Sequence, residues 1–349
     1  MKPAKSEPPV AVGGQAVVEG VMMRAPGATS VAVRRPDGGI ALRVRSAKRV
    51  AAAHPLLGKP TLRGVAILIE TMADGLSALN FSATHAMPES EKPGDAPLTA
   101  AALIATMAVS MAFGFFMFAV LPHLLTFGLG MLTGSESLAG GRAVAFHLVD
   151  GVVKLAIFLA FVWTVSKMKD MRRVFQYHGA EHQAVHALEH GAALTPEGLA
   201  AFPTPHARCG TAFLVTVIAV SILVFAGVFP LMPELSSNRL LNQVLYVGIK
   251  LPLILPIAGL SYEIIRLSAR PGLGLLGRIV SAPGVWVQRI TTQTPDASQQ
   301  EIAIVALKAA LAPERLGVTP EAPEQVRMFD GIQSFLSWTE PGHETGEAR

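Results

Sequence analysis

The chain has 349 residues, 51% of them hydrophobic and only 15% charged, and its mean hydropathy is +0.44. This composition argues against a soluble globular protein and predicts helices that face lipid. The formal net charge of +4 does not indicate a nucleic-acid partner, because basic residues beside a membrane bind anionic lipid headgroups.

The first part of the chain, 12–97, is predicted to be a cytoplasmic region with a hairpin and an amphipathic helix, preceded by a disordered segment at 1–11. Apolar and basic residues alternate from 29 to 45 around Pro36-Asp37-Gly38-Gly39, which predicts a β-hairpin with one side in solvent. Residues 61–83 carry a polar stripe and predict a helix that lies in the membrane interface or against the helical bundle, and the alternative is an ordinary helix of a small cytoplasmic domain. The predicted buried face of the hairpin consists of Val31, Val33, Leu42 and Val44.

Four apolar segments are long enough to cross about 30 Å of hydrocarbon as helices. We expect Pro122 to end or kink the first of them, so that 124–132 makes a short apolar return to the surface. The segments form transmembrane pairs within 98–166 and 211–265, so the predicted fold class is mainly α: a polytopic membrane protein with about four transmembrane helices and a small N-terminal β-hairpin. The four segments are 98–121, 143–166, 211–232 and 240–262.

Basic residues predict how these segments are oriented in the membrane. Lys and Arg cluster after the second and fourth segments, whereas the short loops within the two pairs contain only Arg142 and Arg239. Because Lys and Arg are enriched in cytoplasmic loops, both termini and the stretch 167–210 are predicted to lie in the cytoplasm. The lipid bilayer is therefore an expected partner.

Three charged residues lie inside the apolar segments: Asp150, Lys154 and Lys250. A lone charge at membrane depth is costly and normally faces a partner or water. We expect Asp150 to pair with one of the two lysines, and the alternative is an ion pathway.

The stretch 167–210 contains the motif His178-Gly179-Ala180-Glu181-His182. Residues four apart are neighbours on a helix, so His178 and His182 can bind one cation. The order of residues matches the inverted zinc-protease motif His-x-x-Glu-His, in which the Glu is a general base. Glu181 is therefore the candidate catalytic residue, and the alternative is a solvated helix face rich in histidine.

A catalytic zinc generally takes three protein ligands, so another donor must come from elsewhere in the chain. The candidates are His206 and Cys209, just before the third apolar segment, and Glu263, at the cytoplasmic end of the fourth. Cys209 is the only cysteine, which excludes an internal disulfide. Zinc is the favoured divalent metal, although iron, cobalt and nickel accept the same donors. The alternatives are a solvated linker histidine, a buried small cysteine and an interfacial carboxylate paired with Arg266.

The C-terminal part after the fourth apolar segment, 266–313, is predicted to form juxtamembrane and C-terminal helices. Ser298-Gln299-Gln300-Glu301 has the pattern of a capping box that begins a helix ending near Ala312. The polar composition of 314–349 predicts a disordered tail.

Three stretches carry a resemblance to a known family: GGQAVVEGVMMR at 13–24, FQYHGAEH at 175–182 and HARCGT at 206–211. They resemble the YqhQ-like family of bacterial membrane proteins, which are largely uncharacterised and predicted to be metal-dependent enzymes. The resemblance covers roughly residues 12–312 and implies a protein of the bacterial inner membrane, but it implies no substrate. The metal site it implies consists of His178, Glu181, His182, His206 and Cys209.

Two positions depart from the family pattern. Gln183 stands where Lys more often follows the second His, and Ala207 stands where Pro more often separates His from Arg. Neither change removes a candidate ligand, but with Gln183 in place of Lys this chain has no cationic side chain directly after the second His. In the first stretch, Glu19 could add a carboxylate to the site, and a structural turn is the favoured interpretation.

These features support three functions of different class. The first is a zinc-dependent membrane hydrolase, peptidase-like, acting at the cytoplasmic face on a substrate that the sequence does not identify. The second is a metal or ion transporter, and the third is a scaffold or assembly factor that binds a protein partner.

Overall fold

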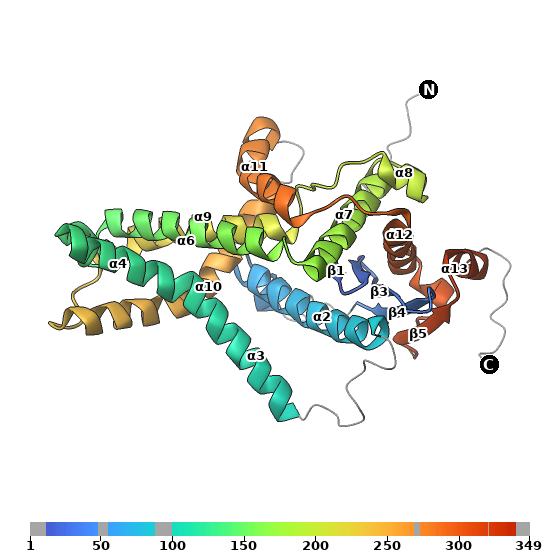
Figure 1. Ribbon diagram of the computed structural model, residues 1–349, viewed down its shortest axis with the longest axis horizontal. Coiled ribbons are helices and arrows are strands. Elements are labelled where there is room, and N and C mark those ends of the chain that lie inside the picture. The colour runs from blue at the N-terminus through green and yellow to red at the C-terminus, as the bar shows by residue number, and fades with distance from the viewer. Residues whose placement is uncertain (1–11, 48–54, 88–99, 269–272, 320, 340–349) are drawn as a thin grey trace.

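The computed structural model describes residues 12–47, 55–87, 100–268, 273–319 and 321–339. It consists of a bundle of long helices at one end and a β-sheet covered by helices at the other (Figure 1). The predicted disorder at 1–11 and at 340–349 lies outside the described residues.

The sheet is an antiparallel meander of five strands, ordered as they occur in the chain. The last strand comes from the C-terminal part and pairs with the fourth, with Phe329 opposite Ile40. The strands are β1 (Gly13–Val17), β2 (Gly20–Arg24), β3 (Ala28–Arg34), β4 (Ile40–Ser46) and β5 (Glu324–Phe329).

The prediction of a disordered tail over 314–349 was wrong for most of its described residues. β5 is followed by α13 (Ile332–Thr339), which buries Phe335 against the core that also contains Phe329. The open edge of β4 has backbone groups that need partners, and β5 satisfies them. This pairing joins residues far apart in the chain, which the local composition does not report.

The predicted hairpin is present as β3 and β4, but its faces differ from the prediction. Val31 is opposite Arg43 and Ala32 is opposite Leu42, so Val31 lies on the face of Arg43 and not on that of Leu42. A change of one residue in register moves every side chain to the other face, and the turn sets that register.

Helices cover both faces of the sheet, so the predicted solvent-facing side does not exist. α12 (Ala297–Leu311) packs on one face, and α2 (Leu62–Ala86), the predicted amphipathic helix, covers the other. The polar stripe of α2 meets the arginines of the sheet: Arg45 Nη2 lies 2.6 Å from Asp74 Oδ1. Ile69 and Met72 of α2 are consequently turned outward and are 61% and 64% exposed.

Among the described residues, the bundle contains four helices that are long and apolar enough to cross a membrane, and they match the four predicted segments closely except for the first. They are Ala108–Thr133, Val144–Val165, Gly210–Leu231 and Arg239–Ser268. The helical cores of the last three are α6 (Val144–Val165), α9 (Gly210–Val228) and α10 (Arg239–Ser268).

The first candidate span runs through Pro122, and the predicted return of 124–132 to the surface was wrong. α3 (Ala100–Phe115) continues through a π-helical turn, Phe116–Val120, into α4 (Leu121–Thr133). A proline ring collides with the carbonyl four residues earlier in an α-helix. The carbonyl four residues before Pro122 belongs to Phe118, which lies inside the π-helical turn, so the α-helical pattern is already interrupted where the collision would occur.

Three further helices connect the bundle to the sheet. α7 (Lys169–Glu189) follows α6 and packs against β1 and α12. α11 (Gly274–Thr291) follows α10 and packs against α9. The predicted capping box of α12 is shifted, because Asp296 and Gln299 form it in place of Ser298 and Glu301.

Candidate metal centre

The candidate metal centre lies where α7, α11 and the start of α9 meet. His178 and His182 are one turn apart on α7, and Cys209 is the residue immediately before α9. One ligand atom from each of the three residues lies within 4.8 Å of the others. The structure therefore brings the predicted histidine pair together with one of the predicted donors from the rest of the chain.

Backbone carbonyls fix the orientation of both histidine rings. Nδ1 of His178 donates to the carbonyl oxygen of Thr291 at 2.8 Å, and Nδ1 of His182 donates to that of Thr204. Because a carbonyl can only accept, each Nδ1 carries the hydrogen and each Nε2 keeps its lone pair. Metal-binding histidines are held in this way by a hydrogen bond from the second nitrogen.

Cys209 completes the donor set. Its Sγ lies 3.2 Å from Nε2 of His178 and accepts the backbone N–H of Thr211 at 3.3 Å. Burial raises the pKa of the Cys209 thiol, so without a cation the sulfur keeps its proton and can donate it to His178. Two imidazole lone pairs and one sulfur fit the donor set of a tetrahedral zinc site with one open position.

Glu181 lies beside these donors, with Oε2 3.5 Å from Nε2 of His182. Burial raises the pKa of Glu181 to about 8, and two groups partly oppose this: the neighbouring His178 and the backbone N–H of Gly14, which hydrogen-bonds to the carboxylate. A Cβ atom on Gly14 would lie only 2.6 Å from Cγ of Glu181. The first glycine-rich stretch of the sequence therefore provides space and one hydrogen bond for this carboxyl group.

Glu19 does not join the centre. It occupies the β1–β2 turn with a left-handed backbone (φ 50°), and its Oε2 accepts hydrogen bonds from Arg173 at 2.5 Å and from the Tyr177 hydroxyl at 3.2 Å. These contacts fasten the turn to α7. The position of Glu19 therefore agrees with the interpretation of this stretch as a structural turn.

His206 lies next to the centre, with its ring centroid 5.7 Å from that of His182, but its orientation does not suit a ligand. Its Nδ1 accepts the backbone N–H of Arg208 at 3.2 Å, so Nε2 carries the hydrogen and faces Glu189 at 3.3 Å. Burial lowers the pKa of His206 to about 4, so the ring is neutral and Nε2 offers no lone pair. His186, Glu189 and His206 are close enough to hold a cation, but Glu189 is also paired with Arg208.

Glu263 is not part of the centre either, although the sequence placed it among the candidate ligands. Arg63 donates two hydrogen bonds to its carboxylate, the Nε bond measuring 2.6 Å, and Arg266 lies 4.0 Å away. α10 ends against α2, and this contact decides the partner of Glu263.

Sequence reasoning missed the carbonyls of Thr204 and Thr291 and the contact between Gly14 and Glu181. Every residue has a carbonyl, so no pattern could identify the two that bind the histidines. Gly14 lies in a stretch that the sequence marked as glycine-rich, and that was its only signal.

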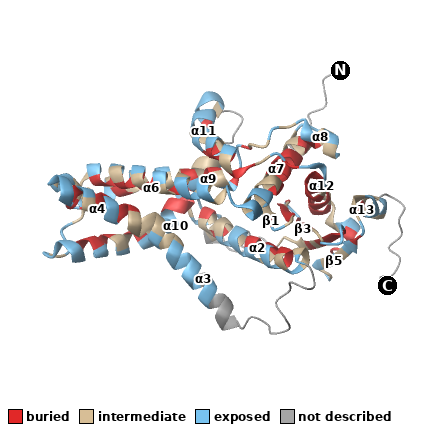
Figure 2. Cartoon of the chain, in the orientation of Figure 1, coloured by how far each residue is buried: buried red, intermediate tan, exposed pale blue. Residues whose placement is uncertain are grey.

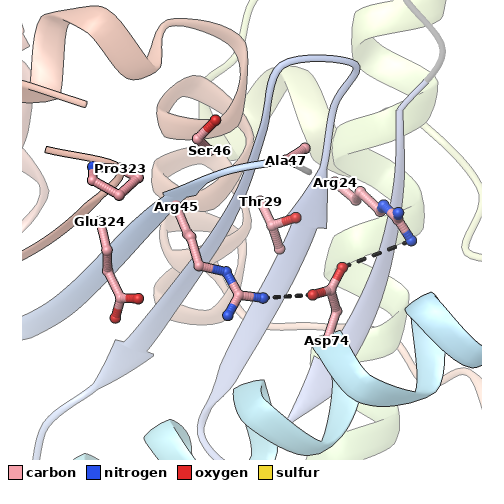
Figure 3. Close-up of a pocket in the computed structure, with 8 residues that line it drawn as sticks. All are labelled: Arg24, Thr29, Arg45, Ser46, Ala47, Asp74, Pro323 and Glu324. Atoms are coloured by element: carbon pink, nitrogen blue, oxygen red, sulfur yellow. Dashed lines mark hydrogen bonds and ion pairs between the residues drawn. The ribbon is translucent and has the colours of Figure 1, made fainter. Parts of the chain in front are cut away.

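A separate surface cavity of about 350 Å³ lies beside the sheet and α2 (Figure 3). Asp74 stands between two of its arginines, 2.6 Å from Arg45 and 3.7 Å from Arg24. Glu324 also lines the cavity, so its two arginines and two carboxylates balance, and the cavity presents a weaker candidate site than the candidate metal centre.

Comparison with known proteins places the chain in a family. Residues 59–313 match the family described as "Protein of unknown function (DUF1385)". The chain is similar to "Uncharacterized protein YqhQ" of Bacillus subtilis (strain 168), with 30% identity over 333 residues that cover 92% of this chain and 98% of that protein. No solved structure matches the chain significantly. The family match spans most of the chain and contains His178, Glu181, His182 and Cys209, and the chain therefore belongs to the DUF1385 family.

Proposed function

We propose that the chain is a metal-dependent hydrolase, peptidase-like in its motif, held in the bacterial inner membrane and acting at the cytoplasmic face. The observation that carries the proposal is the convergence of His178, His182 and Cys209 within 4.8 Å, with Glu181 beside them. Imidazole and thiolate donors favour zinc among the divalent metals.

The protein groups have distinct roles in this proposal. When bound, a divalent cation supplies Lewis acidity that polarises the scissile group and the attacking water. Glu181 acts as the general base that takes a proton from the attacking water and returns it to the leaving group, because its carboxylate lies 3.5 Å from Nε2 of His182 and so beside the proposed ion. Gly14 holds the Glu181 side chain in place, and the carbonyls of Thr204 and Thr291 keep both imidazoles aimed at the centre.

Membrane insertion is supported by the surface of the helical bundle. Figure 2 shows exposed residues along much of α3, α4, α6 and α10. Many of these are large and apolar, and leaving so much apolar surface in water would be costly at about 25 cal/mol per Å². A bilayer covers this surface without that cost. Exposed examples are Val109, Met111, Val152, Val244 and Leu255.

The orientation is supported by the position of the sheet and the basic residues. β5 pairs with β4, so N-terminal and C-terminal parts of the chain lie on the same side of the bundle. Lys167 and Arg172 follow α6 on that side, and Lys167 Nζ lies 5.0 Å from the ring centroid of Trp163, a residue type common at membrane interfaces. Because Lys and Arg are enriched in cytoplasmic loops, these basic residues support a cytoplasmic position for the sheet and the candidate metal centre.

The position of the centre relative to the candidate membrane spans indicates where the substrate binds: at the membrane surface. Cys209 immediately precedes a candidate membrane span, so the donors lie at the surface of the proposed bilayer. The outward apolar residues of α2, including Ile69 and Met72, suit the membrane interface beside it.

Metal analysis of the purified full-length chain tests the proposal. Wild type and Glu181→Gln should each retain about one metal ion per chain, whereas His178→Ala combined with His182→Ala should lose it. His190→Ala is a matched control, because His190 is exposed at the end of the same helix. A wild-type protein purified without chelator that holds no stoichiometric metal would contradict the proposal.

Activity on a panel of peptide and ester substrates provides the second measurement. Glu181→Gln should abolish hydrolysis while the metal remains, because the amide keeps the size and polarity of the side chain but cannot accept a proton. An assembly factor would instead tolerate Glu181→Gln in a complementation assay. Retained function in that assay would count against the enzyme.

A further inference from the structure

A second buried polar cluster lies in the helical bundle, away from the metal centre. Lys250 Nζ is 3.1 Å and Lys154 Nζ is 3.4 Å from Oδ2 of Asp150. The exposed fractions of Asp150, Lys154 and Lys250 are only 1%, 6% and 1%. Asp150 thus pairs with both of the lysines that the sequence analysis named as possible partners. Because two ammonium groups face one carboxylate, the described part of the cluster has one unmatched positive charge among apolar helices.

The hydrogen bonds around Lys250 have a defined direction. The amide nitrogen of Gln243 donates to the carbonyl oxygen of Ala139 at 3.2 Å, so its Oε1 faces Nε2 of His123 at 2.8 Å and accepts from it. Nδ1 of His123 therefore keeps a lone pair, and Lys250 Nζ donates to it at 2.9 Å. A neutral imidazole that can accept a proton is in direct contact with a buried ammonium group.

The carboxylate of Asp150 is incompletely satisfied. Its Oδ1 is buried and has no hydrogen-bond partner among the described residues. Unpartnered buried oxygens are rare, and each costs free energy unless a proton or a water molecule reaches it. This oxygen is a second observation, independent of the charge imbalance, which suggests that the cluster exchanges a proton or a water molecule with solvent.

The position of the cluster in the bundle indicates at which end of the bundle this exchange with solvent takes place. An apolar layer that includes Phe158, Val215 and Val287 lies between the cluster and the end of the bundle with Cys209. On the other side, Gln243 is in the second turn of α10 and Ala139 ends the short helix α5 (Glu136–Ala139), whose Glu136 is exposed. The hydrogen-bonded chain therefore runs from Asp150 toward solvent at the α5 end.

We propose that this cluster releases and rebinds one proton, with Lys250 as the donor and His123 as the relay toward the α5 end of the bundle. One N–H bond of Lys250 breaks, its electron pair stays on Nζ, and the proton forms an N–H bond on Nδ1 of His123. The proton on Nε2 of His123, which faces Oε1 of Gln243, then leaves along that hydrogen bond to a water molecule that enters from the α5 end, and rebinding reverses these steps. The remaining ammonium and carboxylate groups balance, so the cluster becomes neutral.

The charged and titratable groups that face Lys250 come from three helices. α4 contributes His123, α6 contributes His147, Asp150 and Lys154, and α10 contributes Lys250 itself. α9 packs against α6 and α10 and has no titratable side chain. The proton site contains none of the residues of the candidate metal centre. A test of the proton site is therefore independent of a test of the proposed hydrolase.

Nuclear magnetic resonance of the full-length chain in lipid nanodiscs tests this proposal, with ¹⁵N at the side-chain nitrogen of lysine. Over about pH 6 to 10, Lys250 should change from ammonium to amine at lower pH than the exposed lysines. The spectrum of Lys250→Met assigns the signal, with Lys169→Met as an exposed control, and Lys154→Met assigns it by elimination if Lys250→Met does not fold. A Lys250 signal that remains ammonium throughout, or titrates with the exposed lysines, would overturn the proposal.

A second variant tests the relay. His123→Gln keeps a polar side chain beside Gln243 and Lys250 but cannot accept a proton. Exchange of the Lys250 protons with water should slow on the order of 100-fold, because proton transfer by a positioned side chain contributes about that factor. Unchanged exchange in His123→Gln would remove His123 from the pathway.

Discussion

The contact between Gly14 and Glu181 provides a quantitative test of how the candidate metal centre is built. A Cβ atom at Gly14 would lie 2.6 Å from Cγ and 2.7 Å from Oε1 of Glu181. Carbon atoms in contact are normally about 3.5–4.0 Å apart, so Gly14→Ala must displace the Glu181 side chain by about 1 Å. The displacement also weakens the hydrogen bond from the Gly14 N–H to the carboxylate.

Overpacking a well-packed site usually costs about 1–3 kcal/mol, and we expect Gly14→Ala to lower the free energy of unfolding by about 2 kcal/mol. Gly13→Ala is the matched control, because it lies in the same strand and a Cβ atom there has nothing within 4 Å. Its effect should remain within about 0.5 kcal/mol. Denaturant unfolding of both variants in detergent, followed by circular dichroism, measures the difference.

A double-mutant cycle separates the steric contact from a general effect on β1. In a Glu181→Ala background the clashing atoms are absent, so Gly14→Ala should lose most of its cost, with a coupling energy of about 0.5–3 kcal/mol. Equal costs for Gly14→Ala in the two backgrounds, or equal effects of Gly13→Ala and Gly14→Ala, would refute this account of the contact.

Three further predictions concern the metal, the C-terminal segment and the bundle. A chelator should lower the midpoint of thermal unfolding of wild type but not of Cys209→Ser, because a ligand that binds only the folded state stabilises it. Phe335→Ala should lower the free energy of unfolding by about 3–5 kcal/mol, since Phe335 is fully buried, whereas Ser334→Ala at the exposed neighbouring position should have little effect. Asp150→Asn leaves two buried ammonium groups without a carboxylate and should cost about 3–5 kcal/mol in thermal or denaturant unfolding, with exposed Asp170→Asn as the control.

The sequence alone determined the features that depend on local patterns. Apolar segments of membrane length predicted four long helices, and the part of the chain that the structure describes contains four such helices. Alternation around a turn predicted the β3–β4 hairpin, and the spacing of His178 and His182 predicted that their rings share one face of a helix. Periodicity and length are properties of a short stretch of chain, so they can be recognised without knowing what the stretch packs against.

Only the tertiary structure decided which groups meet. The lone-pair orientation of His206 depends on the backbone of Arg208, and the partner of Glu263 is Arg63 on a different helix. Of the three candidates, Cys209 is the one whose ligand atom lies within 4.8 Å of those of His178 and His182. The faces of the hairpin and the pairing of β5 likewise depended on register and on an open sheet edge. These features depend on contacts between residues that are remote in the chain. The free energy of such a contact depends on packing and burial, which no local sequence pattern encodes.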